Sequence, residues 1–299
     1  MVPSKEENID YIVTFGNKAS SIFGDDDYVQ TYFFSVPINQ TSPVFIRIFD
    51  ADCGGKHDQI NGPDYDSKTR FSVYGGNGAY SNKDARNINP VGNFKSGHLL
   101  ESKVFGKNPL ADNVWTTLGP FNPKEAEFDK DLNANVFKIV VEGISGDDGN
   151  TYRFFLSNSA TRNQAIEGGN AFAYEICFRL MNEPNEAAHF YPFIDKNVVA
   201  IKQHNFDFDS DGFIRLTSVA KKEHALEGSA DGQWMESTTP ITEEEQNTSI
   251  DIHFMKKTNR SNDMVFYTTN QYNESIPFFS VPIGGIPKYR YKVNVEYKF

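Results

Sequence analysis

The chain has 299 residues, of which 14% are aromatic and 23% are charged, and its formal net charge at pH 7 is −11. This acidic excess argues against a nucleic-acid interface or an anionic membrane surface, because both would repel the protein. No stretch approaches the roughly eighteen consecutive apolar residues of a spanning helix, so we expect no membrane insertion.

In chain order, short apolar or alternating segments are separated by polar turns. In the first half we expect strands at 11–15, 32–36, 44–49, 69–75, 114–118, 136–142, 152–156 and 171–180. In the second half we expect them at 198–203, 213–219, 233–236, 249–254, 264–269, 277–281 and 289–297. Short helices are expected at 160–167 and 220–226, but nothing is long enough for crossover helices. The pattern predicts an all-β fold with two β-sandwich domains, jelly-roll or immunoglobulin-like.

We place the domain boundary in the polar segment that contains Pro184, which interrupts the strand pattern. The first domain then spans residues 1–184 and the second spans 188–299. The hexapeptide Phe-Phe-Ser-Val-Pro-Ile occurs at both 33–38 and 278–283. It reflects either a duplication or the reuse of similar residues where strands enter similar turns. The two cysteines, Cys53 and Cys177, are either one bridge or two quiet thiols.

Acidic loops follow several of the predicted strands. The strand at 44–49 runs into a loop with Asp50, Asp52 and Asp58, where Gly54 and Gly55 permit a tight turn. Calcium binds six to eight oxygens from carboxylates, carbonyls and water, which such a loop can supply. Other acidic loops carry Asp25, Asp26 and Asp27, Asp64 and Asp66, and Asp147 and Asp148. Loops from one end of a sandwich could share an ion, whereas each loop alone could equally be a solvated acidic turn.

The sharpest motif is Asp207-Phe-Asp209-Ser-Asp211-Gly, the first six positions of a calcium loop. The closing glutamate of an EF-hand is replaced by Ser218, and the flanking segments read as strands. We therefore expect a calcium-bound β-turn, with an unmetallated Asp-rich turn as the alternative.

A long segment without periodicity, residues 76–97, is the candidate ligand-binding loop, since long connections are often functional. Aromatic, amide and guanidinium side chains suited to sugar recognition lie in or near it, although they also serve ordinary loop hydrogen bonding. These candidates are Tyr74, Tyr80, Asn82, Arg86, Asn87 and, later in the chain, Trp115.

The strand Tyr-Phe-Phe-Ser-Val-Pro at 32–37, then Phe-Ile-Arg-Ile-Phe-Asp-Ala-Asp at 45–52 and Arg-Phe-Ser-Val-Tyr-Gly at 70–75, resemble bacterial pre-peptidase C-terminal domains. The resemblance covers about residues 24–157. It implies a calcium-associated β-sandwich of an exported protein, with Asp50, Asp52 and Asp147 as ligands. The 76–97 segment departs from that compact pattern.

For enzyme chemistry the sequence offers no nucleophile elbow, zinc-protease motif or phosphate loop. The six histidines are scattered, and we assign no catalytic residue. We expect a calcium-stabilised binding or adhesion module, extracellular or on a bacterial cell surface after loss of a signal peptide, with a glycan or surface protein as partner and unknown oligomeric state. A calcium-dependent secreted hydrolase and a structural envelope component are the alternatives.

Overall fold

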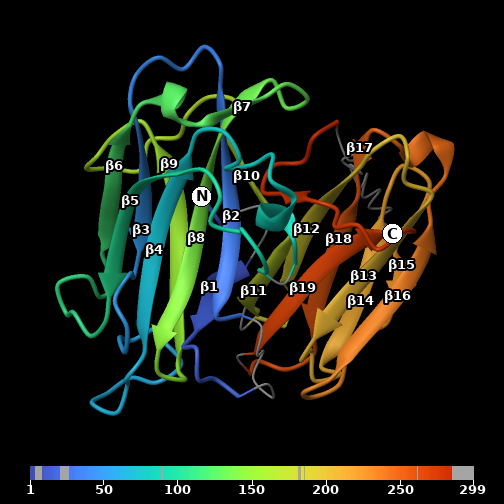
Figure 1. The fold of residues 1–299 in the computed structure, drawn as a ribbon. Coiled ribbons are helices and arrows are strands. Elements are labelled where there is room, and N and C mark those ends of the chain that lie inside the picture. Colours follow the sequence, from blue (N-terminus) through green and yellow to red (C-terminus); the bar gives the residue numbers. More distant parts are fainter. Residues whose placement is uncertain are drawn as a thin grey trace, which may run out of the picture.

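The computed structural model describes residues 1–3, 9–20, 27–88, 90–180, 183–184, 186–260 and 262–284. It confirms the all-β prediction, with two large antiparallel sheets of eight and twelve strands (Figure 1). The helical elements in these residues are three 3-10 turns, η2 (Lys83–Arg86), η3 (Pro123–Glu125) and η4 (Glu243–Glu245). The two expected short helices are wrong: residues 160–167 form bends, an isolated bridge from Ala165 to Ser157 and the start of a turn, and 220–226 end in a strand.

The first half of the chain contributes four strands to the eight-stranded sheet and six to the twelve-stranded sheet. Its part of the eight-stranded sheet runs in the order β1 (Ile9–Phe15), β9 (Gly149–Ser157), β3 (Val44–Phe49) and β6 (Trp115–Phe121). Its part of the twelve-stranded sheet runs β2 (Val29–Pro37), β8 (Ala134–Ser145), β4 (Lys68–Gly75) and β5 (His98–Phe105). The short β7 (Glu127–Asp129) pairs with β8.

The second half does the same with later strands. Its part of the eight-stranded sheet is β11 (Glu175–Leu180), β19 (Asp263–Asn270), β13 (Ala200–Phe206) and β16 (Trp234–Pro240). In the other sheet it places β12 (Ala187–Ile194), β18 (Asp251–Lys256), β14 (Gly212–Thr217) and β15 (His224–Leu226). The short β17 (Thr248–Ser249) pairs with β12.

Both halves therefore repeat one topology, in which each of the eight main strands of the first half corresponds to the strand ten numbers later. The orders 1-9-3-6 and 2-8-4-5 are those of a jelly roll, and the second half gives 11-19-13-16 and 12-18-14-15. Figure 1 shows the two units side by side. The sheets continue across them, because β1 pairs with β11 while β10 (Asn170–Ala173) and β20 (Phe278–Phe279) join β2 to β12.

The topological repeat begins at β11, which the predicted division at 184 places in the first domain. Strand β11 corresponds to β1 and pairs with both β1 and β19. Residues 181, 182 and 185 of the predicted boundary lie outside the described residues. The division into two separately folding domains stays a prediction.

The repeated hexapeptide does not mark this duplication, since its copies lie in β2 and at β20, which are not corresponding strands. Instead both copies flank β10. Phe172 of β10 is the register partner of Phe33 on one side and Phe279 on the other, with ring centroids 5.1 and 4.9 Å away. The two copies therefore flank one strand, although Phe33 is the first residue of its copy and Phe279 is the second residue of the other.

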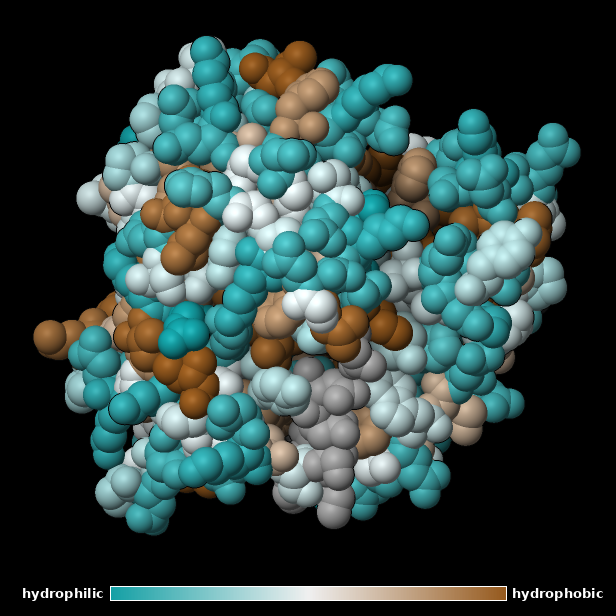
Figure 2. Space-filling model, viewed as in Figure 1, coloured by the Kyte–Doolittle hydropathy of each residue, from teal (hydrophilic) through white to brown (hydrophobic). Residues whose placement is uncertain are grey.

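Strand alternation explains which residues fill the core. Ile46 and Ile48 of β3 are fully buried between the sheets, whereas Arg47 lies on the outer face. Aromatic rings pack edge-to-face in the same space, as Phe71 does against Tyr152 with centroids 5.0 Å apart. The face seen in Figure 2 is mostly hydrophilic, and its hydrophobic residues form separate patches.

Cys53 and Cys177 are free, buried thiols and form no disulfide, so the second of the two alternatives holds. Burial raises the pKa of Cys53 to about 12, so this thiol stays protonated and unreactive at neutral pH.

Candidate functional site

Three carboxylates meet where β3 ends. Asp50, Asp52 and Asp112 each place a carboxylate oxygen within 4.8 Å of the others. Asp50 has a φ of 59°, and its backbone N–H donates to the Val114 carbonyl at 3.1 Å. In return, the backbone N–H of Asn113 donates to Asp50 Oδ1 at 2.6 Å. This exchange holds the segment before β6 against the end of β3 and brings Asp112 to the other two carboxylates.

Two of the three residues in this first acidic triad, Asp50 and Asp52, are buried, and Asp112 is partly buried. Asp50 is fully buried and Asp52 is 2% exposed. Three oxygens, Asp50 Oδ2, Asp52 Oδ1 and Asp112 Oδ1, are buried without a hydrogen-bond partner in the described part of the chain. Burial, and after it the negative charges of Asp50 and Asp112, raise the pKa of Asp52 to about 7. A bound cation would supply the missing partner for all three oxygens.

Asp58, predicted as a ligand with these residues, has a different role. Its carboxylate accepts the backbone N–H groups of Gly54 and Gly55 at 2.7 and 2.8 Å, and that of Thr151 at 2.7 Å. Asp58 therefore shapes the loop and ties it to β9. Gly55 is also required for the triad, because a Cβ there would lie 2.4 Å from Asp112 Oδ1.

The second half repeats this arrangement after β13, the strand that corresponds to β3. Asp207, Asp209 and Asp231 form a second acidic triad with the same 4.8 Å spacing. Asp207 has a φ of 61°, its N–H donates to the Gln233 carbonyl at 3.3 Å, and Gly232 N–H donates to its Oδ1 at 2.7 Å. Both the geometry and the direction of each hydrogen bond match those around Asp50.

The second triad is more exposed and better neutralised than the first. Asp209 and Asp231 are exposed, and the positive charges of Lys256 and Arg260 partly offset the burial that raises the pKa of Asp209. Burial raises the pKa of Asp207 to about 6. A cation would bind here more weakly than at the first triad.

Asp211, the third aspartate of the predicted calcium loop, lies on the other side of the turn. Its Oδ1 accepts the Thr258 backbone N–H at 3.1 Å, and its carbonyl accepts the Lys257 N–H at 2.9 Å. It joins the connection between β13 and β14 to the loop after β18. The structure thus assembles the triad with Asp231 in its place.

Neither Asp112 nor Asp231 was among the residues selected from the sequence. A signal was available, because each stands three residues before a tryptophan that begins the sixth strand of its unit, Trp115 or Trp234. Because the chain has two tryptophans, a spacing that they share could arise by chance. The Asp-x-x-Trp spacing becomes informative only once the topological repeat is known.

Asp147 and Asp148 lie in a separate cluster with Asp66. Asp148 is buried and its Oδ2 accepts the Asp66 backbone N–H at 3.2 Å, whereas Asp66 and Asp147 are exposed. The predicted sharing of one ion between this loop and Asp50 is therefore not what the structure arranges. Asp25 and Asp26 lie outside the described residues.

Most of the predicted ligand-binding residues pack the 76–97 segment onto the outer face of the twelve-stranded sheet. Tyr80 lies edge-on to Phe33 at 5.4 Å, and Arg86 covers the Tyr80 ring at 5.3 Å. Asn82 caps η2 by accepting the Asp84 N–H, and Tyr74 is buried. Asn87 lines a small recess beside Thr31 and Glu175. These contacts fix the segment in place and leave few of its rings free.

Trp115 lies on the opposite side of the molecule, on the outer face of the eight-stranded sheet beside the first acidic triad. Its ring packs 5.4 Å from Phe49 and 6.2 Å from Phe155. The structure therefore does not bring Trp115 together with Tyr80 and Arg86.

The second half repeats this aromatic group as well. Trp234 packs 5.2 Å from Phe206 and 5.4 Å from Tyr267, the residues that correspond in register to Phe49 and Phe155. Trp234 is 42% exposed. Each unit thus combines an acidic triad at the end of its third strand with an aromatic group on the outer face of the eight-stranded sheet.

No known protein-family model matches the chain, and no curated protein sequence matches it significantly. Among the described residues, no helix has the length and apolar character needed to cross a membrane.

Proposed function

We propose that the chain is a non-catalytic, calcium-stabilised glycan-binding module of an exported or cell-surface bacterial protein. The observation that supports this best is the repeated pairing of an acidic triad with a tryptophan. In both units the third aspartate of the triad stands three residues before the tryptophan. An ion bound by that aspartate therefore also fixes the position of the tryptophan.

Calcium fits the two triads better than other metals. Asp50, Asp52 and Asp112 offer only oxygen ligands, from separate segments that can adjust, and calcium accepts such irregular oxygen sets. When bound, the ion neutralises the three carboxylates. The Asp-x-x-Trp segment then holds one conformation, and the aromatic group beside it is preorganised for a ligand.

A sugar is the ligand class that matches the aromatic groups. The face of an indole or phenol ring packs well against the C–H face of a pyranose, and polar neighbours select its hydroxyl groups. Around Trp234 these neighbours are Glu236, Lys202 and His204, with His204 stacked on Tyr267 at a centroid distance of 4.3 Å. The greater exposure of Trp234 makes the second unit the stronger candidate for direct contact.

The test is affinity electrophoresis of the whole chain through gels containing soluble polysaccharides, in calcium and in chelator. We expect retardation by at least one polysaccharide, weakened by Trp234→Ala and by chelator. Tyr272→Ala is the matched control, since Tyr272 is a 74% exposed aromatic residue outside both groups. Equal mobility of wild type and Trp234→Ala in every polysaccharide that retards the protein would contradict glycan binding at this face.

A further inference from the structure

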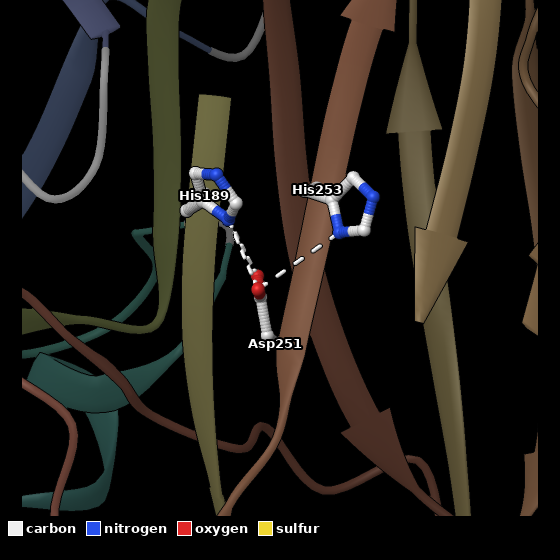
Figure 3. A group of neighbouring side chains, drawn as sticks. All are labelled: His189, Asp251 and His253. Atoms are coloured by element: carbon white, nitrogen blue, oxygen red, sulfur yellow. Dashed lines mark hydrogen bonds and ion pairs between the residues drawn. The ribbon is translucent and has the colours of Figure 1, made fainter. Parts of the chain in front are cut away.

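Three side chains converge on the outer face of the twelve-stranded sheet in the second unit (Figure 3). His189 lies on β12, and Asp251 and His253 lie on the neighbouring strand β18. His189 and His253 are register partners, and Asp251 shares their face because strand side chains alternate. The adjacent residues Phe190 and Ile252 belong to the core on the opposite face.

The ligand atoms of these three residues have the spacing of a metal site. His189 Nδ1 lies 2.9 Å from Asp251 Oδ1, and His253 Nδ1 lies 3.9 Å from Asp251 Oδ2. One ligand atom of each residue lies within 4.8 Å of the other two. Bonds of about 2.0–2.1 Å place the ligands of a tetrahedral zinc ion roughly 3.4 Å apart, which these separations bracket.

The strongest indication comes from His253. Its side chain is almost wholly buried, with 6% of the residue exposed, and its Nδ1 has no hydrogen-bond partner among the residues described. Its other nitrogen, Nε2, lies 3.5 Å from Glu223 Oε2. A proton on Nε2, facing that carboxylate, leaves the Nδ1 lone pair directed at Asp251. In that tautomer a lone pair and a carboxylate face each other at a largely buried position, and a cation bound between them would remove the repulsion.

We propose that His189, Asp251 and His253 bind a divalent first-row transition ion such as zinc, and that Glu223 orients His253. Two imidazole nitrogens and one carboxylate suit zinc and its neighbours, whereas calcium prefers an all-oxygen set. The site is therefore distinct in chemistry and in place from both acidic triads. Because His189 is only partly buried, a water molecule can complete the coordination.

The first unit has no equivalent among its described residues, for a structural reason. There the 76–97 segment covers the same sheet face, where it packs on Phe33 and Val136 and accepts hydrogen bonds from the buried Lys138 of β8. In the second unit the corresponding connection, between β14 and β15, comprises only residues 218–223. The uncovered face carries histidines and carboxylates instead.

The test is calorimetric titration of the metal-stripped whole chain with zinc, in excess calcium so that the acidic triads are occupied. We expect one zinc ion per chain, lost in His189→Gln and in His253→Gln and retained in His98→Gln, an exposed histidine away from the site. Glu223→Gln should weaken binding by about 10- to 100-fold, as loss of a supporting carboxylate does.

Two results would overturn the proposal: no saturable zinc binding by the wild type, or equal binding by the wild type and both histidine variants. If either histidine variant fails to fold, cobalt replaces zinc as the probe of the wild-type chain. Visible absorption bands of low-symmetry cobalt with nitrogen ligands, displaced by zinc, support the site, and their absence overturns it.

Discussion

Asp50 and Asp207 occupy the same position in the two units, each the first residue after the third strand and each with a positive φ, 59° and 61°. Each accepts a backbone N–H from the residue that follows the third aspartate of its triad, at 2.6 and 2.7 Å. Left-handed backbone is unfavourable for a non-glycine residue, but aspartate tolerates it better than most. Its occurrence at two corresponding sites, with the same hydrogen bonds, indicates that the conformation serves a purpose common to both.

The first prediction concerns Asp52→Asn. If calcium binds the first triad, the wild type gains about 2.7 kcal/mol of stability when calcium is a hundredfold above its Kd. The variant should lose most of this gain, because one charged ligand is missing. In chelator the variant should be as stable as the wild type or more so, since removing a buried charge relieves repulsion from Asp50 and Asp112. Melting temperature in calcium and in chelator measures both effects.

Asp64→Asn is the control for that experiment, as Asp64 is an exposed carboxylate outside the acidic clusters. It should keep the full calcium response. If the melting temperature of the wild type is the same in calcium and in chelator, calcium does not stabilise the protein.

The sequence was sufficient to predict the fold class because strand alternation is local. Residues such as Ile46, Arg47 and Ile48 identify the core-facing and outward-facing sides of a strand without knowledge of its partners. The triads needed long-range information: Asp112 reaches Asp50 only through the pairing of β3 with β6, which no local pattern encodes. Asp58 and Asp211 fit the sequence pattern of metal ligands, but their carboxylates accept backbone N–H groups instead. Short polar side chains near turns commonly make such hydrogen bonds.

The histidines of the proposed metal site likewise come together only through strand pairing. Neither His189 nor His253 has another histidine near it in the sequence, yet the two are register partners on neighbouring strands. The local part of the site, Asp251-x-His253, was readable as two side chains on one face of a strand.

A second prediction separates Asp209 from Asp211 in the motif Asp-x-Asp-x-Asp. Asp209→Ala deletes a triad ligand and should destabilise the protein only when calcium is present. Asp211→Ala removes the hydrogen bonds to Thr258 and should cost about 1 kcal/mol with or without calcium. Calcium titrations of melting temperature for both variants distinguish these roles. Matching responses in the two variants would mean that the turn acts as one acidic unit.

A third prediction concerns pH. The pKa of Asp52 rises from 3.8 to about 7 in the folded protein, chiefly through burial. Between these values the folded state keeps a proton that the unfolded chain has released. The contribution of Asp52 to stability is therefore greatest at low pH and falls as pH rises through this range. In chelator, the melting temperature of the wild type should fall relative to Asp52→Asn between about pH 4 and pH 7.

Calcium should reverse that trend, because it binds the ionised carboxylates and its stabilising effect grows as pH rises. Parallel pH profiles for the wild type and Asp52→Asn in chelator would show that the carboxyl group titrates normally.

A fourth prediction concerns the division of the chain. Proteolysis between 182 and 187 should give two fragments, as the polar sequence there suggests. The fragments should remain associated under native conditions and melt together, because β1–β11 pairing and the β10–β20 bridge connect both sheets. Size-exclusion chromatography of the nicked protein tests this. Fragments that elute separately would instead indicate two independent sandwiches.

The last prediction uses the two tryptophans as separate reporters of the two units. Trp234→Phe leaves Trp115 as the chain's one tryptophan, and Trp115→Phe leaves Trp234. Each tryptophan stands three residues after a triad aspartate, so calcium binding should change its fluorescence emission. The first triad is more deeply buried and lacks the nearby Lys256 and Arg260 of the second. Trp115 should therefore respond at lower calcium than Trp234, and Asp52→Asn should abolish the Trp115 response while leaving that of Trp234 intact. A single calcium midpoint shared by both reporters, or a Trp115 signal that survives Asp52→Asn, would show that the triads are not the sites that calcium fills.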